Sequence, residues 1–331
     1  MTRILGHQPA MQRFTRLLQE QRLPHAWLLY GQQGVGKAML AEQMAAAYFC
    51  ESLTEEGLPC GQCHSCAMLR AESHPDFMHC GIAWNEKKKK FNRDIGVDQI
   101  RDILSFMAMS GSQSERRVVL LDDANAMNAA SANGLLKGLE EPQAGSLLII
   151  VCHDLTRLPA TIRSRCMLEH CAPLSAEDVQ LVLSDMSLAE RVQVLAHDLA
   201  TGCPGRVQCL QDGDLAQAAL TWYEMLNDMT TADVGMMDAW LQKHVSLIPH
   251  DLIVAIVMLH LEKYLDGPVE KEAAQKAAGN TASFVAYQGL LDAAYAVLAW
   301  PAEVLRHSLR PAPALLSRIL DVRAALKKCG N

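Results

Sequence analysis

Aromatic residues and excess positive charge are both scarce in this chain of 331 residues. Phe, Trp and Tyr make up only 5% of it, and its apolar content is spread among Ala, Leu, Val and Met, which favours a helix-rich globular protein over a β-sandwich. The net charge of -7 excludes a protein that wraps nucleic acid with its whole surface, although a local basic face stays possible. Residues 1–7 hold no long apolar run, so we expect no signal peptide, no membrane span and a cytoplasmic location.

A hydroxyl group is also missing, at the position where a phosphate-binding pattern ends. The pattern G-x-x-x-x-G-K-[ST] is satisfied from Gly31 to Lys37 and then meets Ala38. Gly31, Gly34 and Gly36 let successive backbone N–H groups turn toward phosphate oxygens, and Lys37 adds a cation for the terminal phosphates. A Ser or Thr at position 38 would ligate magnesium, and alanine cannot. The loop therefore predicts a nucleotide-binding fold whose capacity for hydrolysis is in question.

A pair of carboxylates, Asp122 and Asp123, follows the apolar stretch at 118–121. In P-loop ATPases the first acid holds magnesium and the second, usually Glu, polarises the attacking water. Asp123 is one methylene shorter than Glu, which displaces the water-orienting group and slows the chemistry. An apolar strand followed by an acid is common by itself, but downstream of a P-loop it predicts the second half of a nucleotide site.

Four of the 11 cysteines form a cluster in the sequence. Cys60, Cys63 and Cys66 stand at x2 spacing, and Cys50 precedes them. In a reducing compartment these residues do not form a disulfide framework, and four thiolates at this spacing fit a tetrahedral structural zinc site. Iron–sulfur ligation and unliganded packing are the alternatives, and His64 is the alternative fourth ligand if Cys50 is too far away. The remaining cysteines are isolated and are expected to pack as small apolar residues.

The pattern of apolar residues divides the chain. Up to about residue 171, short apolar runs alternate with helical periodicity, which predicts a parallel sheet covered by helices. Beyond Pro173 the periodicity is helical throughout. The expected strands are 26–30, 76–80, 118–121, 147–152 and 167–170, and the expected helices include 37–50, 97–107, 129–140, 175–183 and 188–200.

We therefore expect three domains, because a chain of this length exceeds one ordinary domain. They are an α/β P-loop domain over 1–171 with a zinc-binding insertion at 50–66, a small helical domain over 172–211, and an all-α domain over 212–331.

Two charged features each have two interpretations. Arg165 lies at the end of the stretch 158–166, where it either forms a surface salt bridge or projects toward a neighbouring subunit to stabilise phosphoryl-transfer charge. The residues alone favour the surface salt bridge. The run Lys87 to Lys90 is either a solvated turn, which is the commoner case, or a DNA contact.

Taken together, the motifs resemble the clamp-loader branch of the AAA+ ATPases, and within it the family of bacterial DNA polymerase III delta-prime subunits. The resemblance covers roughly residues 20 to 210, and its order of motifs agrees throughout. The run Leu-Leu-Lys-x-Leu-Glu-Glu-Pro followed by Ser-Arg-Cys is its most specific part. Besides the P-loop and the zinc cysteines, it rests on 23–26, 74–76, 122–124, 132–142 and 164–166.

The resemblance implies a RecA-like domain, a helical lid and a collar that joins a five-subunit ring. By the same resemblance, Arg165 is an arginine finger that reaches the ATP site of an adjacent gamma or tau motor subunit, which reverses the preference for a plain surface arginine. The implied partners are those motor subunits and the delta subunit, with the sliding clamp and primer-template DNA engaged through the complex. The location implied is the cytoplasmic replisome at the nucleoid.

Four departures from the family's motor subunits point the same way. They are Ala38, Asp123, His153 at the first-sensor position, and Arg206 one residue away from the sensor arginine of the lid. They imply a stator whose own ATPase is absent or very weak and whose binding of ATP and magnesium is doubtful. No polymerase site is visible, so the chain would belong to the DNA-directed DNA polymerase holoenzyme without performing its nucleotidyl transfer.

Two other functions remain open. One is an ATP-hydrolysing motor subunit of the gamma or tau type, which the intact Gly31, Gly34, Gly36 and Lys37 allow. The other is a stand-alone zinc module that binds nucleic acid through Lys87 to Lys90, which the net charge disfavours.

Overall fold

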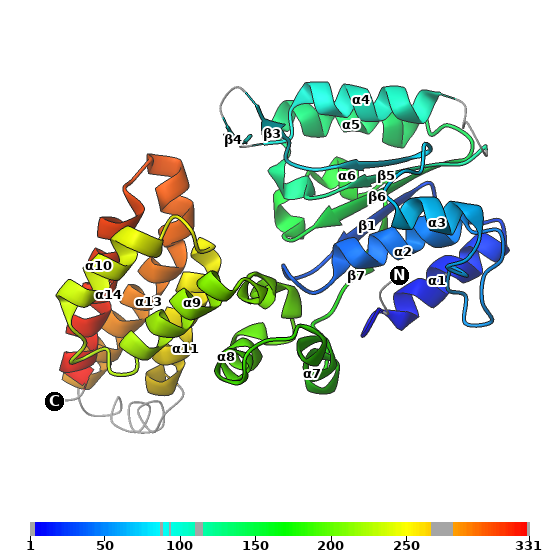
Figure 1. Ribbon diagram of the computed structural model, residues 1–331. Helices are drawn as coiled ribbons and strands as arrows, with labels where there is room; N and C mark the ends of the chain where they lie inside the picture. Colours follow the sequence, from blue (N-terminus) through cyan, green and yellow to red (C-terminus); the bar gives the residue numbers. More distant parts are fainter. Residues whose placement is uncertain (1–3, 87–88, 93, 110–114, 266–280, 330–331) are drawn as a thin grey trace. The chain divides into compact units, whose positions relative to one another are not determined.

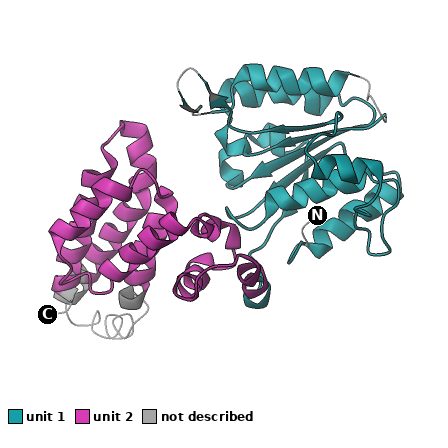
Figure 2. Cartoon of the chain, in the orientation of Figure 1, with its two compact units in different colours: residues 1–178 teal, residues 179–331 magenta. Residues whose placement is uncertain are grey.

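The computed structural model describes the chain except residues 1–3, 87–88, 93, 110–114, 266–280 and 330–331. The chain folds into two compact units, Met1–Asp178 and Val179–Asn331 (Figure 2). Among the helices of the described ranges, none is both long enough and apolar enough to cross a membrane.

A five-stranded parallel sheet forms the centre of the first unit (Figure 1), as the alternating pattern predicts. Its order is β2-β5-β6-β1-β7, and Leu28 of β1 pairs with Ile150 of β6 and with Leu168 of β7. β1, β5 and β6 are apolar along almost their whole length because helices cover both faces of the sheet. The strands are β1 (Ala26–Tyr30), β2 (Phe77–Cys80), β5 (Arg117–Leu121), β6 (Ser146–Cys152) and β7 (Met167–His170), each within one residue of its predicted bounds.

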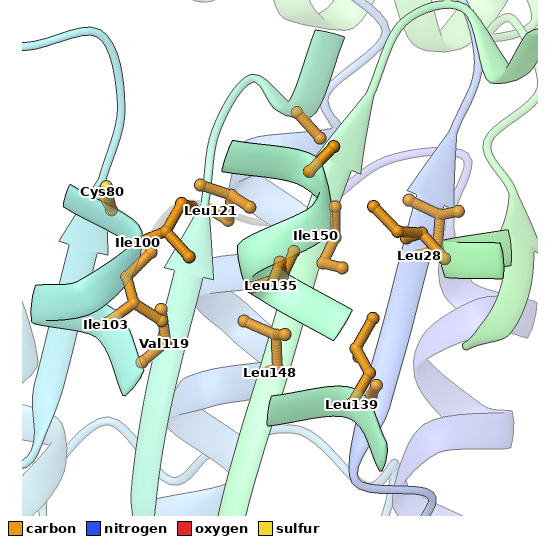
Figure 3. Close-up of a cluster of buried hydrophobic side chains, with 14 of the residues drawn as sticks. Leu28, Cys80, Ile100, Ile103, Val119, Leu121, Leu135, Leu139, Leu148 and Ile150 are labelled. Atoms are coloured by element: carbon orange, nitrogen blue, oxygen red, sulfur yellow. The ribbon is translucent and has the colours of Figure 1, made fainter. Parts of the chain in front are cut away.

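One face of this sheet is covered by α4 (Val97–Ala108), α5 (Ala129–Glu140) and the short α6 (Ala160–Arg163). α5 begins where the Asn128 side chain accepts the N–H of Ser131. Leucine and isoleucine side chains from α4 and α5 pack on those of β1, β5 and β6 (Figure 3). The labelled core residues of Figure 3 are Leu28, Cys80, Ile100, Ile103, Val119, Leu121, Leu135, Leu139, Leu148 and Ile150.

The opposite face is covered by α1 (Gln8–Gln19) and α2 (Lys37–Phe49). The ring of Phe14 on α1 meets Trp27 on β1 edge to face, with their centroids 5.3 Å apart. α3 (His64–Arg70) follows α2 after an irregular segment and packs against it. Because all strands of the sheet are parallel, their carboxyl ends lie at one edge, which is where ligands bind in open parallel sheets.

The second unit is helical in all its described parts. Its interior holds Trp222 and Trp240, whose rings stack with centroids 4.6 Å apart, together with the fully buried Trp300. The predicted helices 175–183 and 188–200 correspond to α7 (Ala176–Asp185), which the boundary between the units cuts, and α8 (Glu190–Ala200). The remaining elements are the 3-10 segment η3 (Pro204–Gln211), α9 (Gly213–Met225), α10 (Val234–His244), α11 (His250–Leu265), α13 (Thr281–His307) and α14 (Pro311–Cys329).

Candidate functional site

The phosphate-binding pattern forms a loop between β1 and the first residue of α2. Gly31, Gly34 and Gly36 all have positive φ angles, of 150°, 81° and 100°, and Gly36 is the residue that precedes α2. At Gly31 a side chain is also excluded by space, because a Cβ there would lie 2.2 Å from the carbonyl oxygen of Cys171. The three glycines therefore produce the loop geometry that the pattern predicts.

Lys37 is buried at the start of α2, with 3% of its surface exposed. Its Nζ donates to the carbonyl oxygens of Gly31 and Gln32, both at 2.7 Å. Burial lowers the pKa of Lys37, and the nearby Asp123 and Asp122 carboxylates oppose that shift. The ammonium group is thus held over the loop, facing the acid pair.

The acid pair lies at the carboxyl end of β5, and the imidazole of His153 lies beside it at the end of β6. Nε2 of His153 is 3.5 Å from Oδ2 of Asp123, while Oδ1 of Asp123 accepts the N–H of Asn125 at 2.8 Å. Burial lowers the pKa of His153, and Asp123 opposes the shift. Burial also raises the pKa of Asp122. Each oxygen of Asp123 thus faces a partner within its own chain.

Asn125, which sequence reasoning missed, connects the two strand ends that form this site. Its Oδ1 accepts the N–H groups of His153 (2.7 Å) and Asp154 (2.9 Å), and its Nδ2 donates to the Asp154 carbonyl at 2.8 Å. The amide therefore fixes where His153 stands relative to Asp123. Its position two residues after the acid pair is the only signal of this role in the sequence.

We predict that Asn125→Ala lowers the free energy of unfolding by about 1–3 kcal/mol, because two backbone N–H groups lose their acceptor. Chemical denaturation followed by circular dichroism measures this. Asn133→Ala, on the exposed surface of α5, is the matched control and should change stability far less. Equal stability of the two variants would show that the Asn125 amide does not hold the site together.

His7, which sequence reasoning also missed, contacts the phosphate loop from the N-terminal end of α1. It is the residue before α1 and is buried, and its Nε2 lies 2.8 Å from the carbonyl oxygen of Val35. The contact spans 28 residues of sequence, so no local pattern reveals it. It connects α1 to the loop that precedes α2.

The four clustered cysteines come together at the end of α2 and the start of α3. Every pair of sulfur atoms among Cys50, Cys60, Cys63 and Cys66 lies within 4.8 Å, and His64 is not part of the group. Such a group of four thiols can hold one metal ion. Cys50 follows α2 directly and Cys63 directly precedes α3, so the group ties these two helices together.

Backbone N–H groups point at the sulfur atoms of this cluster. Sγ of Cys50 accepts the N–H of Cys60 at 3.3 Å, and Sγ of Cys60 accepts those of Gln62 and Cys63 at 3.4 and 3.3 Å. The last two hydrogen bonds lower the pKa of the Cys60 thiol to about 6, whereas burial raises the pKa values of Cys50 and Cys66. N–H donors that stabilise thiolates, together with a set of soft ligands, fit zinc.

Arg165 lies in the turn after α6, away from the metal-ligand group. Its Nη2 pairs with Oε1 of Glu140 at 2.7 Å, and its Nη1 donates to the Thr161 carbonyl at 3.0 Å. The side chains of Arg165 and Glu140 are 37% and 51% exposed. The surface salt bridge of the first interpretation is therefore present, on a side chain that is accessible to other molecules.

The remaining residues singled out in the sequence are Arg206 and the lysine run. Arg206 lies in η3 of the second unit, where its Nη1 contacts Oγ1 of Thr201 at 3.3 Å. Of the lysine run, Lys87 and Lys88 lie outside the described residues, Lys89 is exposed, and Lys90 begins a short strand.

A sequence model described as DNA polymerase III, delta subunit, matches residues 6–175. The chain is also similar to the DNA polymerase III subunit delta' of Pseudomonas aeruginosa, with 39% identity over 56% of the chain and 55% of that protein. It is 33% identical to the delta' subunit of Haemophilus influenzae over 58% of the chain and 57% of that protein. A DNA polymerase III subunit gamma of Buchnera aphidicola is 35% identical over 48% of the chain and 41% of that protein.

The parallel sheet, with its phosphate loop after β1 and its acid pair after β5, makes the first unit a P-loop domain of the RecA-like, AAA+ class. The chain belongs to the DNA polymerase III delta subunit family. The matches span little more than half the length of the two delta' relatives, and the family match ends at residue 175.

Proposed function

We propose that the chain is a delta-prime-type subunit of a bacterial clamp loader. In this role it is a stator that joins gamma or tau motor subunits and a delta subunit in a five-subunit ring. It helps to load the sliding clamp on primed DNA, and it donates Arg165 in trans to the ATP site of a neighbouring motor. Relatives named delta' and gamma support a place in such an assembly.

The nucleotide site of the chain itself is the observation that carries this proposal. The loop glycines and Lys37 keep the shape of a phosphate site, but Ala38 offers no magnesium ligand and Asp123 is engaged by Asn125 and His153. A domain in this state can keep the fold of a motor and occupy a motor's place in a ring. It is poorly equipped to hydrolyse nucleotide.

The position of Arg165 supports its role in trans. A guanidinium forms bidentate contacts with phosphate, and the turn after α6 presents it at the surface. Its present partner, Glu140, is more exposed than Arg165 itself, and exposed ion pairs contribute only about 0–1 kcal/mol. A neighbour's phosphate can therefore replace Glu140 at little cost.

We further propose that the ion held by Cys50, Cys60, Cys63 and Cys66 is a structural zinc. Four protein thiolates complete a tetrahedral shell and leave no open position for catalysis. The ion would then stabilise the connection between α2 and α3. The three-domain division into P-loop domain, lid (172–211) and collar (212–331) belongs to the same proposal.

The isolated chain distinguishes a stator from a motor. With ATP and magnesium, the purified chain should show no turnover above background, and Ala38→Thr alone should not restore it, because Asp123 remains engaged. Nucleotide binding by both proteins, followed by calorimetry, shows whether the loop still binds phosphate. Turnover that Lys37→Ala abolishes would support the alternative, an ATP-hydrolysing motor subunit.

A further inference from the structure

Helix α13 of the second unit is apolar on two of its faces. One face packs against α11 and α14 (Figure 1), and Val297 and Trp300 on that face are fully buried. The other face carries Tyr295, Leu298 and Leu305, which are 68%, 48% and 71% exposed. A helix that is apolar on most of its circumference is ordinarily buried on all sides. The exposed face of α13 is therefore a surface that a partner would cover.

The apolar residues of this exposed face form a regular row. Leu291, Tyr295, Leu298, Ala302 and Leu305 follow one another at steps of 4, 3, 4 and 3 residues. This is the heptad spacing of a helix that packs along its length against another helix. Apolar residues that are exposed singly need no explanation, but a row at this spacing does. We call these five residues the α13 seam.

Two exposed charges of opposite sign flank the α13 seam near its two ends. Asp292 and Arg306 stand two heptads apart, so they lie on the same side of the seam. Among the residues that the structure describes, neither has an ion-pair partner, and Asp292 accepts only the amide of Gln288, at 3.3 Å. A second copy of the helix in antiparallel orientation brings Asp292 of each copy opposite Arg306 of the other, whereas a parallel copy brings like charges together. The charges therefore complement those of an antiparallel second copy of this chain.

We propose that the free chain forms a two-fold symmetric dimer through the α13 seam. Antiparallel pairing places Tyr295 against Leu305 of the partner subunit and Leu298 against Ala302 of the partner subunit. Each helix contributes the same surface, so the contact is closed and adds no third chain. Neither Arg165 nor the nucleotide loop takes part, so the dimer forms or fails independently of the proposed function.

The length of the α13 seam sets the strength expected of this dimer. It spans about two heptads, which is short, and an interface of this kind falls at the small end of specific interfaces. We therefore expect a dimer that dissociates on dilution in the micromolar range. Sedimentation velocity of the full chain from about 1 to 100 μM should show the passage from monomer to dimer. A chain that stays monomeric over this whole range overturns the proposal.

A charge placed within the seam tests which surface is used. Leu305→Glu should weaken dimerisation by about a hundredfold or more, because the dimer would bury two unpaired carboxylates. Leu305→Met keeps an apolar side chain and should retain most of the affinity. Val194→Glu on α8 is the matched control, since Val194 is 63% exposed and lies outside the seam. Circular dichroism should show the same fold for all of them, because both positions are exposed in the single chain.

Exchange of the flanking charges tests the antiparallel orientation. Asp292→Arg and Arg306→Asp should each weaken the dimer by about tenfold, because each turns two attractive pairs into like-charge pairs. The chain with both changes should recover most of this loss, because the pairs are restored with their signs reversed. A doubly changed chain that dimerises no better than the single variants would contradict the antiparallel pairing.

Two further results would overturn the assignment to a second copy. One is a dimer that Leu305→Glu leaves as strong as the parent dimer, which would place the contact elsewhere. The other is a monomeric parent whose Leu305→Glu variant, still folded, no longer associates with a purified gamma or delta subunit. That outcome would make the α13 seam a docking site for a different protein.

Discussion

Replacing Arg165 by alanine is expected to lower the DNA-stimulated ATPase of the assembled clamp-loader complex by about a thousandfold per affected site. The loss arises in the neighbouring motor subunit, because the guanidinium neutralises charge on the transferring phosphoryl group in its transition state. The purified complex, reconstituted with the variant chain, is assayed for phosphate release with primed DNA. ATP sites of the complex that do not border this chain keep their activity, and they determine the ATPase rate that remains.

Three comparisons make this result specific. Arg165→Lys should recover only part of the activity, since an ammonium retains the charge but not the planar fork. Arg157→Ala, an exposed arginine in the preceding 3-10 turn, should leave the rate unchanged. Gel filtration should show the same assembly for all variants, since the contacts of Arg165 within the described part of the chain are an exposed ion pair and local hydrogen bonds. Full ATPase activity in the Arg165→Ala complex would show that Arg165 is a surface residue without a role in the neighbouring ATP site.

Cys63→Ser is expected to release the metal ion and to destabilise the first unit by several kcal/mol. The parent should contain about one equivalent of zinc by metal analysis, and binding energy at such sites is folding energy. The effect should concentrate where α2 and α3 meet, since the cluster joins these helices. Thermal unfolding with and without a chelator, together with metal analysis, measures both parts.

Cys209→Ser is the matched control, because Cys209 is a partly exposed free thiol outside the cluster. The Cys209→Ser chain should retain about one equivalent of zinc, and it should unfold at the same temperature as the parent chain. A parent chain that folds fully without metal, and whose stability a chelator does not change, would leave the cluster as packed thiols. Iron in place of zinc would contradict the metal assignment alone.

The sheet and the cysteine cluster were predictable because their signals are local. Strands buried on both faces must be apolar runs, so β1 starts and ends where predicted, and β5 and β6 differ by one residue. Cysteines at x2 spacing can meet at one point whatever surrounds them, and the geometry brings Cys50 to them as well. The fold class followed from these signals.

Contacts between distant segments could not be predicted in the same way. His7 reaches the carbonyl of Val35, and the Asn125 amide holds the end of β6, through contacts that depend on the assembled sheet. The engagement of Asp123 by His153 is of this kind too. The sequence showed only that position 123 lacks a Glu. The antiparallel strands β3 (Trp84–Asn85) and β4 (Lys90–Phe91) were not predicted, because strands of two residues leave no periodic signal.

The central claim is that this chain acts in another subunit's nucleotide site and not in its own. The most direct test compares Lys37→Ala with Arg165→Ala, each built into the reconstituted complex and assayed for DNA-stimulated ATP turnover. We expect the loss caused by Arg165→Ala to exceed the loss caused by Lys37→Ala by about a hundredfold or more. A larger loss from Lys37→Ala would contradict it and identify the chain as a motor.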